Sequence, residues 1–405
     1  MEKLKAYKVE IDPTEKQKEK IKQSQGTLRF IWNLYVGQVT LEYKQAKEKG
    51  MKYLVPNDSK FYKWINEEYI PEHNATWIKE THNKSIKEVL RVCYQTYQNA
   101  FKGKCNFPRF KKKSESNDPS LYFVKNDKNT FIISNRHYVK VPGFGRIHLK
   151  EKGRIPTVTK ENTDQYISSG RLEYKSGKYY IVVLVKTLDA KPVIYKHTNK
   201  GVGIDLGIKS LAYTSDGVSY KNITKAKKYK KIQKKIKRKQ RAFSRKVESY
   251  KKRKETTEGY PTTSNLDKNR KEIAKLYARK TRIKNDYIWK MCIDILKDNP
   301  EYIVLEDLNI KGMMKNKNLA KTIAECSWYR IKQTLIYLCN ERGIEVRIVD
   351  RYYPSSKTCH TCGHKKEDLK LKDRIYVCKE CGEVLDRDYN ASLNLRDAKK
   401  YTIVK

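Results

Sequence analysis

Two Cys-x2-Cys pairs constrain the fold of this 405-residue chain more than any other feature of its sequence. Cys359 and Cys362 form the first pair, and after fifteen intervening residues Cys378 and Cys381 form the second. This spacing predicts a zinc ribbon, in which each pair lies in a tight knuckle and four thiolates bind one ion. Four protein ligands complete a tetrahedron and leave no position for water, so the predicted zinc is structural and not catalytic.

The residues around the cysteines agree with this prediction. Gly363 and Gly382 follow the second cysteine of each pair, and glycine permits the turn that directs two sulfurs at one metal. His360 and His364 could each replace a thiolate, but with four cysteines present we expect both histidines at the surface. Unligated thiols and a redox pair are the alternative interpretations of the cluster.

The remaining cysteines and the hydropathy of the chain indicate its compartment. A chain of this length can bury a core in each of two to four domains and needs no disulfides. No stretch approaches the roughly 18 apolar residues of a membrane span, and residues 1–5 lack the apolar run of a signal peptide. These features predict a cytoplasmic protein with no membrane partner. The other five cysteines stand among apolar neighbours, as expected of reduced core thiols: Cys93, Cys105, Cys292, Cys326 and Cys339.

The charge of the chain predicts a polyanionic partner. Lysine and arginine number 90 against 46 acidic residues, a net charge of +44, which would repel itself in a compact state unless a polyanion neutralised it. The excess is spread over the whole chain, which favours nucleic acid over an anionic membrane surface. Residues 225–241 contain no acid and keep an apolar stripe at helical spacing, so they predict a helix that lies along phosphates; a solvated lysine-rich face is the alternative.

The first half of the chain alternates between strand and helix patterns. One strand precedes two helical patterns and several strands follow them, which predicts a small β-barrel with the helices as an insertion. The expected helices cover 27–41 and 86–101, and a polar helix begins after Asp12-Pro13-Thr14. The expected strands cover 5–12, 122–124, 131–133, 138–141, 171–174 and 179–186, the last two flanking a turn at Ser176-Gly177.

The pattern changes at residue 202, where strands and helices begin to alternate. Such alternation predicts an α/β sheet. The expected elements are a strand over 202–207, a hairpin over 210–219, two long helices, a strand over 302–308, a helix over 328–340 and a strand over 344–350.

Three acids stand at the ends of elements in this second half. Asp205 lies between Gly203 and Gly207 on an apolar strand, Glu306 ends the next apolar strand, and Asp388 follows the cysteine cluster where a helix begins. Each acid alone is more often a cap or a turn residue. Together they match the carboxylates that two-metal phosphodiester cleavage requires, with magnesium as the expected ion.

Four segments around these acids and cysteines resemble the motifs of the TnpB family. Its members are transposon-encoded RNA-guided nucleases, similar to the compact type V CRISPR effectors. The four segments are Val202-Gly203-Ile204-Asp205-Leu206-Gly207, Val304-Leu305-Glu306-Asp307-Leu308-Asn309, Ser355-Ser356-x2-Cys359-x2-Cys362-Gly363 and Asp386-Arg387-Asp388-x-Asn390-Ala391.

The resemblance implies roles for the acids. The split RuvC-like site of the family has one acid in each of three motifs, which correspond by position to Asp205, Glu306 and Asp388. Ser392 and Leu395 stand where the family often has alanine and isoleucine, and neither would hold metal. The resemblance covers nearly the whole chain, because the segments 7–14, 28–33, 107–111 and 141–145 look like the wedge and recognition domains of the family.

The resemblance also implies a multidomain fold, α/β plus β-barrel. An RNase H-like (RuvC) nuclease domain would cover 197–354 and 384–405, with the zinc ribbon inserted at 355–383 as the domain that binds target nucleic acid. A wedge β-barrel would cover 1–22 and 103–196, with a helical recognition domain inserted at 23–102.

The function that the resemblance implies is RNA-guided cleavage of double-stranded DNA next to a short transposon-associated motif. The partners would be a guide RNA from the transposon end and the target DNA, with one protein per RNA. Such a protein would be cytoplasmic and associated with the nucleoid when bound to DNA. A compact type V CRISPR effector, a self-sufficient transposase and a non-catalytic RNA-guided repressor are the alternatives.

Overall fold

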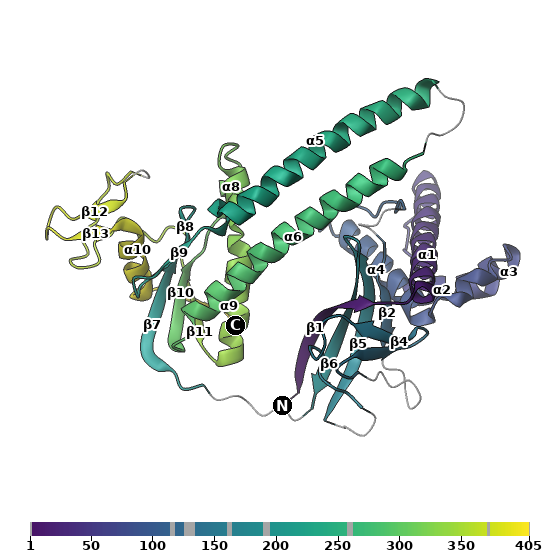
Figure 1. Cartoon of the computed structure of the whole chain (residues 1–405), viewed down its shortest axis with the longest axis horizontal. Coiled ribbons are helices and arrows are strands. Elements are labelled where there is room, and N and C mark those ends of the chain that lie inside the picture. Colours follow the sequence, from purple (N-terminus) through teal and green to yellow (C-terminus); the bar gives the residue numbers. More distant parts are fainter. Residues whose placement is uncertain are drawn as a thin grey trace. The chain divides into compact units, whose positions relative to one another are not determined.

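The computed structural model of the chain comprises two compact units, Met1–Pro192 and Val193–Lys405 (Figure 1). The structure describes residues 2–113, 118–124, 134–159, 164–188, 195–256, 262–370 and 373–404. Among these residues, no helix is both long and apolar enough to cross a membrane.

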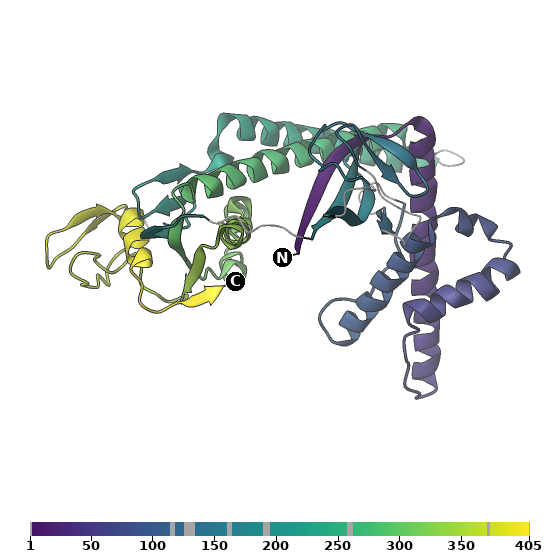
Figure 2. The same ribbon diagram turned by 90° about the horizontal axis from the view of Figure 1, so that it is seen from below.

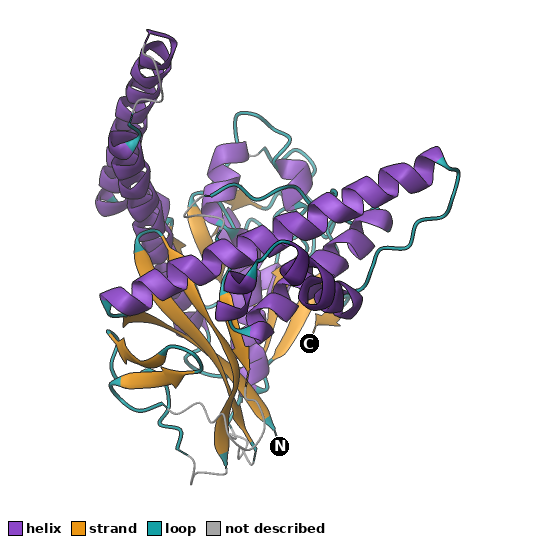
Figure 3. Cartoon of the chain, turned by 90° about the vertical axis from the view of Figure 1, so that its right-hand side faces the viewer, coloured by secondary structure: helices purple, strands orange, loops and turns teal. Residues whose placement is uncertain are grey.

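A six-stranded antiparallel sheet forms the base of the first unit (Figure 3). The strand order is β2-β5-β6-β1-β4-β3, so the N-terminal strand lies between strands that follow the helices in sequence, as the predicted insertion requires. Among the described residues β2 and β3 are its edges, so the structure shows an open half-barrel where the sequence predicts a barrel. The strand predicted at 131–133 lies outside the described residues. The strands are β1 (Lys3–Asp12), β2 (Leu121–Val124), β3 (Tyr138–Val141), β4 (Gly145–Leu149), β5 (Gln165–Lys175) and β6 (Lys178–Thr187).

The longest helix of this unit is α1 (Glu15–Glu48). A capping box begins it: the Thr14 hydroxyl accepts a hydrogen bond from the Gln17 backbone N–H at 3.3 Å, and the Gln17 side chain accepts one from the Thr14 N–H at 3.0 Å. The polar helix predicted after Thr14 and the apolar helix predicted at 27–41 are therefore one helix. The other helical elements are α2 (Asp58–Trp64), a π-helical turn (Ile65–Tyr69), α3 (Ile70–Glu72), a 3-10 turn (Thr76–Glu80) and α4 (Asn83–Phe101).

A mixed six-stranded sheet forms the centre of the second unit, as the alternating pattern predicts. Its order is β14-β11-β10-β7-β8-β9; β7, β10 and β11 are parallel, and the flanking strands are antiparallel. The C-terminal edge strand β14 is not among the predicted elements. The strands are β7 (Thr198–Asp205), β8 (Ser210–Thr214), β9 (Ser219–Lys221), β10 (Pro300–Glu306), β11 (Glu345–Val349) and β14 (Thr402–Val404).

Two long helices of this unit, α5 (Lys227–Thr256) and α6 (Ser264–Ile295), run side by side in Figures 1 and 2. The C-terminal part of α6 and helix α9 (Trp328–Arg342) supply apolar side chains to the core of the sheet. On α5 only Tyr229, Ile232 and Ile236 are buried, so most of its lysines and arginines face solvent. The short helices are a 3-10 turn (Ile223–Lys225), α7 (Ile310–Met313) and α8 (Ala320–Cys326).

A small hairpin separates β11 from the helix α10 (Arg387–Arg396). Its strands β12 (Ile375–Val377) and β13 (Val384–Asp386) are antiparallel, and α10 lies between this hairpin and the sheet (Figure 1). Of the five cysteines predicted as core thiols, Cys93, Cys292, Cys326 and Cys339 are buried. The prediction is wrong for Cys105, because it lies in an exposed segment after α4.

Candidate metal centres

Asp205 and Glu306 lie at the same edge of the second sheet. Asp205 ends β7 and Glu306 ends β10, and these two strands are parallel neighbours. The register pairs Ile204 with Leu305, so the two acids are the next residues of adjacent strands. The carboxyl ends of parallel strands are where open α/β sheets bind ligands.

Helix α10 brings Asp388 to the same edge. A Cβ atom at Gly203 would lie 2.0 Å from the carbonyl oxygen of Ser392 and 2.4 Å from the backbone nitrogen of Arg396, so only glycine lets α10 pack on β7. Asp388 lies in the first turn of α10, where the N-cap residue Asp386 accepts hydrogen bonds from two backbone N–H groups. Gly203 is therefore the point of closest approach between this helix and strand.

The charges of Glu306 and Asp388 act on the carboxylate of Asp205. Burial, and then the negative charges of Glu306 and Asp388, raise the pKa of Asp205 well above its usual value. Burial also raises the pKa of Glu306, and a hydrogen bond from Ser355 opposes this shift. Carboxylates that repel one another in this way would gain from a cation between them.

The spacing of the three acids differs from that of the cysteines. Among the described residues, the four cysteines are the one group of three or more possible ligands whose donor atoms all lie within 4.8 Å of one another. The three carboxylates are spread more widely. Two ions about 3.5–4 Å apart need a wider arrangement of ligands than one tetrahedral ion does.

Asp307, next to Glu306, takes no part in this group. Its carboxylate lies 2.8 Å from the Arg351 guanidinium and 3.8 Å from the Lys332 ammonium. These cations neutralise it outside the group of three acids.

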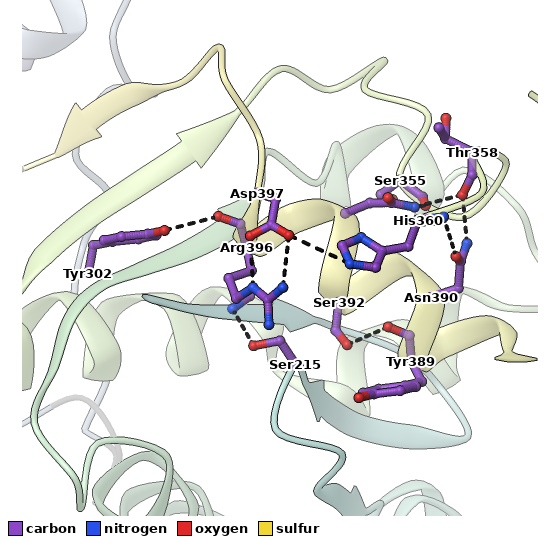
Figure 4. A network of polar contacts seen from close by, with 12 residues as sticks. Ser215, Tyr302, Ser355, Thr358, His360, Tyr389, Asn390, Ser392, Arg396 and Asp397 are labelled. Carbon is purple, nitrogen blue, oxygen red and sulfur yellow. Dashed lines mark hydrogen bonds and ion pairs between the residues drawn. The ribbon is translucent and has the colours of Figure 1, made fainter. Parts of the chain in front are cut away.

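A network of polar groups joins Glu306 to the cysteine segment, and Figure 4 shows the part of it around Thr358 and Asn390. The Ser355 hydroxyl donates a hydrogen bond to Glu306, and the Ser355 carbonyl accepts one from Asn394 at 2.7 Å. Asn390 and Asn394 both donate to the Thr358 carbonyl at 2.7 Å. Since both asparagines belong to α10, the helix that carries Asp388 also holds the loop that contacts Glu306.

The sequence interpretation gave Ser355 and Asn390 only as parts of motifs and did not single out Asn394. The signal that could have found the asparagines is their i, i+4 spacing on an otherwise apolar helix face, which places two amides on one side.

The cysteine cluster has the geometry of a metal centre. The sulfur atoms of Cys359 and Cys381 lie 3.7 Å apart, and those of Cys362 and Cys378 lie 3.5 Å apart. Thiolates on one tetrahedral zinc ion at about 2.3 Å lie roughly 3.8 Å from each other. The backbone N–H groups of Cys381 and Glu380 lower the pKa of the Cys378 thiol to about 6, whereas burial and hydrogen bonds with the other cysteines raise the pKa of the Cys362 and Cys381 thiols. The four cysteines could therefore hold one metal ion.

The knuckle glycines match their prediction, whereas the two histidines are less exposed than predicted. Gly363 and Gly382 have φ angles of 76° and 75°, in the left-handed region that glycine favours. His360 and His364 are half-buried, each 3.7 Å from a carboxylate: His360 pairs with Asp397, which Arg396 also binds, and His364 pairs with Glu380 (Figure 4 for His360). Neither histidine belongs to the sulfur cluster.

Three family models match the chain. The model OrfB_IS605, described as a probable transposase, matches residues 180–317 and includes Asp205 and Glu306. The model described as the TNB domain of Cas12f1-like proteins matches 328–395 and includes the four cysteines and Asp388. A helix-turn-helix model of the same OrfB_IS605 group matches 1–48. The chain belongs to the TnpB family.

Relatives in this family align with nearly the whole chain. A protein of Streptomyces pristinaespiralis named "Putative RNA-guided DNA endonuclease" is 26% identical over 96% of this chain and 88% of its own length. The Escherichia coli K12 protein named "Putative RNA-guided DNA endonuclease InsQ" is 26% identical over 98% of this chain and 92% of its own.

A solved structure of a Cas12f1-sgRNA-target DNA complex has the same fold. It matches with a TM-score of 0.54 and 15% identity, and the match covers 99% of this chain and 100% of the other.

In the part matched by the helix-turn-helix model, this TnpB family member has a strand followed by one unbroken helix, α1, within the described residues.

Proposed function

We propose that this chain is an RNA-guided endonuclease that cleaves double-stranded DNA next to a short transposon-associated motif. Its guide would be an RNA derived from the end of the transposon, with one chain per RNA. Two relatives that align with nearly the whole chain carry RNA-guided DNA endonuclease in their names. The observation that carries the proposal is the meeting of Asp205, Glu306 and Asp388 at one sheet edge.

The three acids would be the catalytic residues and would hold two magnesium ions. When bound, magnesium activates the attacking water and stabilises the leaving oxygen. The acids fit this role because carboxylates are the protein ligands that magnesium prefers, with other positions left to water and phosphate. Ser355 would orient the Glu306 carboxylate through its hydrogen bond.

The second unit would be an RNase H-like (RuvC) nuclease domain over 197–354 and 384–405. A zinc ribbon at 355–383 would be inserted in it, with zinc on Cys359, Cys362, Cys378 and Cys381. A wedge domain over 1–22 and 103–196, with a recognition domain over 23–102, would account for the first unit and extend a few residues beyond its boundary at Pro192. The solvent-facing lysines of α5 support a role in which this helix holds phosphates without reading bases.

The test is cleavage of a plasmid by the purified chain with the RNA that copurifies with it. We expect that RNA, once sequenced, to contain a transposon end and an adjoining guide. Asp205→Ala, Glu306→Ala and Asp388→Ala should each abolish cleavage and keep RNA binding. Asp286→Ala, which removes an exposed acid on α6 paired with Lys290, should cleave as the wild type does.

Two outcomes would contradict the proposal. Cleavage that survives the loss of any one of the three acids would show that they are not the site. Strand joining in place of guided cleavage would identify a self-sufficient transposase. If the RNA instead derived from a neighbouring repeat array, the chain would be a compact CRISPR effector with the same chemistry.

A further inference from the structure

The segment 101–113 of the first unit has an unusual composition. Its sequence, Phe-Lys-Gly-Lys-Cys-Asn-Phe-Pro-Arg-Phe-Lys-Lys-Lys, contains six cations, three phenylalanines and no acid. Except at Pro108 and Lys111, every residue of the segment is exposed. We call it the Phe/Lys segment.

Side chains of α1 fix the backbone of the Phe/Lys segment. The Trp32 indole N–H donates a hydrogen bond to the Arg109 carbonyl at 3.0 Å. The Asn33 amide accepts from the Lys111 N–H at 2.7 Å and donates to the Lys111 carbonyl at 3.1 Å, which imitates the pairing of a neighbouring strand. The Lys111 ammonium lies 3.4 Å from the centre of the Trp32 ring. These contacts hold the segment against α1 at Arg109 and Lys111, so a ligand would not have to order this part of it.

The three phenylalanine rings of the segment are supported on one side and open on the other. Phe101 is 45% exposed, Phe107 49% and Phe110 60%. Phe107 packs edge-on against Phe101, with ring centres 5.1 Å apart. The Phe110 ring lies over Gly37 of α1, where an added Cβ would be 3.8 Å from it. Apolar rings this exposed and this well supported offer flat surface to a partner.

Cations flank the phenylalanines in the sequence of the segment. Lys102, Lys104, Arg109, Lys112 and Lys113 are exposed, and among the described residues no carboxylate forms an ion pair with them. A second copy of the same surface would bring these charges against their equals, which disfavours self-association through it. The partner that satisfies open aromatic faces and unpaired cations together is a single-stranded nucleic acid, whose bases stack and whose phosphates take the cations.

We propose that the Phe/Lys segment binds unpaired nucleotides of RNA, with bases stacked on Phe107 and Phe110 and phosphates held by the surrounding cations. The choice of RNA rests on the proposed function, because a preformed surface suits the partner that stays bound through the reaction. Recognition of RNA by proteins relies largely on such unpaired bases and on aromatic stacking.

The test measures binding of a 20-nucleotide oligouridylate to the full chain freed of RNA. A salt concentration of about 0.3 M suppresses non-specific attraction to the +44 chain and leaves stacking. We expect the double variant Phe107→Leu/Phe110→Leu to bind on the order of tenfold more weakly, since each stacked base contributes strongly to the binding free energy. The double variant Phe107→Tyr/Phe110→Tyr keeps both aromatic rings and should bind like wild type.

A matched control is Trp77→Leu. Trp77 is 40% exposed, but its helical neighbourhood carries the acids Glu67, Glu68, Glu72 and Glu80, so we expect unchanged binding. Ultraviolet crosslinking of wild-type protein should attach uridine to peptides within 101–113. This readout does not depend on the folding of any variant.

Four outcomes would overturn the inference. The Leu double variant could bind like wild type, or crosslinks could lie only elsewhere. Oligothymidylate could bind more tightly than oligouridylate, which would assign the surface to a DNA strand. Wild-type dimers that the Leu variant dissociates would assign it to a second copy. Guided cleavage distinguishes this inference from the proposed function. If the chain cuts with its guide but fails these tests, only the inference is wrong. If the chain crosslinks as expected but lacks guided cleavage, only the proposed function is wrong.

Discussion

The hydroxyl of Ser355 donates a hydrogen bond to the carboxylate of Glu306, across forty-nine positions of sequence. This bond is the direct connection between the segment that leads into the cysteine cluster and the acid that ends β10. Because Asn394 of α10 holds the Ser355 carbonyl, the geometry of Glu306 depends on α10 as well as on its own strand.

Ser355→Ala should make cleavage more sensitive to acid. Burial raises the pKa of Glu306 and the Ser355 hydrogen bond lowers it, so removal of the hydroxyl raises this pKa further. A hydrogen bond to a charged group contributes about 1.5–3 kcal/mol, so the acidic limb of the pH–rate profile should move upward by roughly 1–2 units. The neighbouring Ser356→Ala serves as control. An acidic limb that stays in place in Ser355→Ala would contradict the assigned role.

Asp205→Asn should stabilise the metal-free protein. The folded state raises the pKa of Asp205, so between the unfolded value near 4 and that raised value the folded state binds more protons, and stability falls as pH rises. We expect the variant to gain about 1–2 kcal/mol, a rise of several degrees in melting temperature at pH 8, and less at pH 5. Calorimetry in a chelating buffer measures the melting temperatures of the variant and the wild type at both pH values. A variant that melts below wild type at both pH values would show that the repulsion among the acids is not released.

Removal of the metal from the cysteine cluster should disable the acids indirectly. Without the metal, nothing would join the two cysteine knuckles. The loop around Thr358, which accepts hydrogen bonds from Asn390 and Asn394, would then be less well fixed. We expect Cys378→Ser to lose bound zinc, measured by metal analysis, and most of its cleavage activity. Cys105→Ser removes an exposed thiol outside the cluster and should keep both. Full cleavage activity in a zinc-free Cys378→Ser protein would show that the three acids do not depend on the metal in the cysteine cluster.

Gly203→Ala should damage the packing of α10. The added Cβ would meet backbone atoms of Ser392 and Arg396, which cannot move as a flexible side chain can. Such overpacking costs about 1–3 kcal/mol or more, and any shift of α10 would move Asp388. Gly26→Ala, on α1, meets only the end of the Arg29 side chain and should be neutral or stabilising. Chemical denaturation compares the two variants; equal stability would contradict the contact.

The sequence predicted those features of the second unit that depend on local pattern. The Cys-x2-Cys spacing predicted the sulfur cluster, and the apolar patterns at 202–207 and 302–308 predicted the strands that carry Asp205 and Glu306, which in the structure end at these acids. Register between strands cannot be read from periodicity, so their adjacency appeared only with the parallel pairing of β7 and β10. The role of Ser355 depends on a contact between distant segments, which no local pattern encodes.

In the first unit, too, local patterns were predicted and contacts between distant segments were not. The boundary between polar and apolar stretches inside α1 predicted two helices, because an amphipathic pattern does not show whether a helix continues across a polar stretch. The helices around α2 and α3 lack a strong period and were not predicted. Segments 28–33 and 107–111 stood out separately in the sequence, and the structure joins them through Trp32 and Asn33.

The order in which the acids occur along the chain has a consequence for biosynthesis. A ribosome that has just made Asp205 must add roughly 180 further residues before Asp388 exists, which takes on the order of ten to forty seconds. During that interval the nascent chain already presents β7 and later β10, but α10 is missing from its place against Gly203. The nascent chain would therefore lack one of its three proposed catalytic acids until its synthesis is nearly complete.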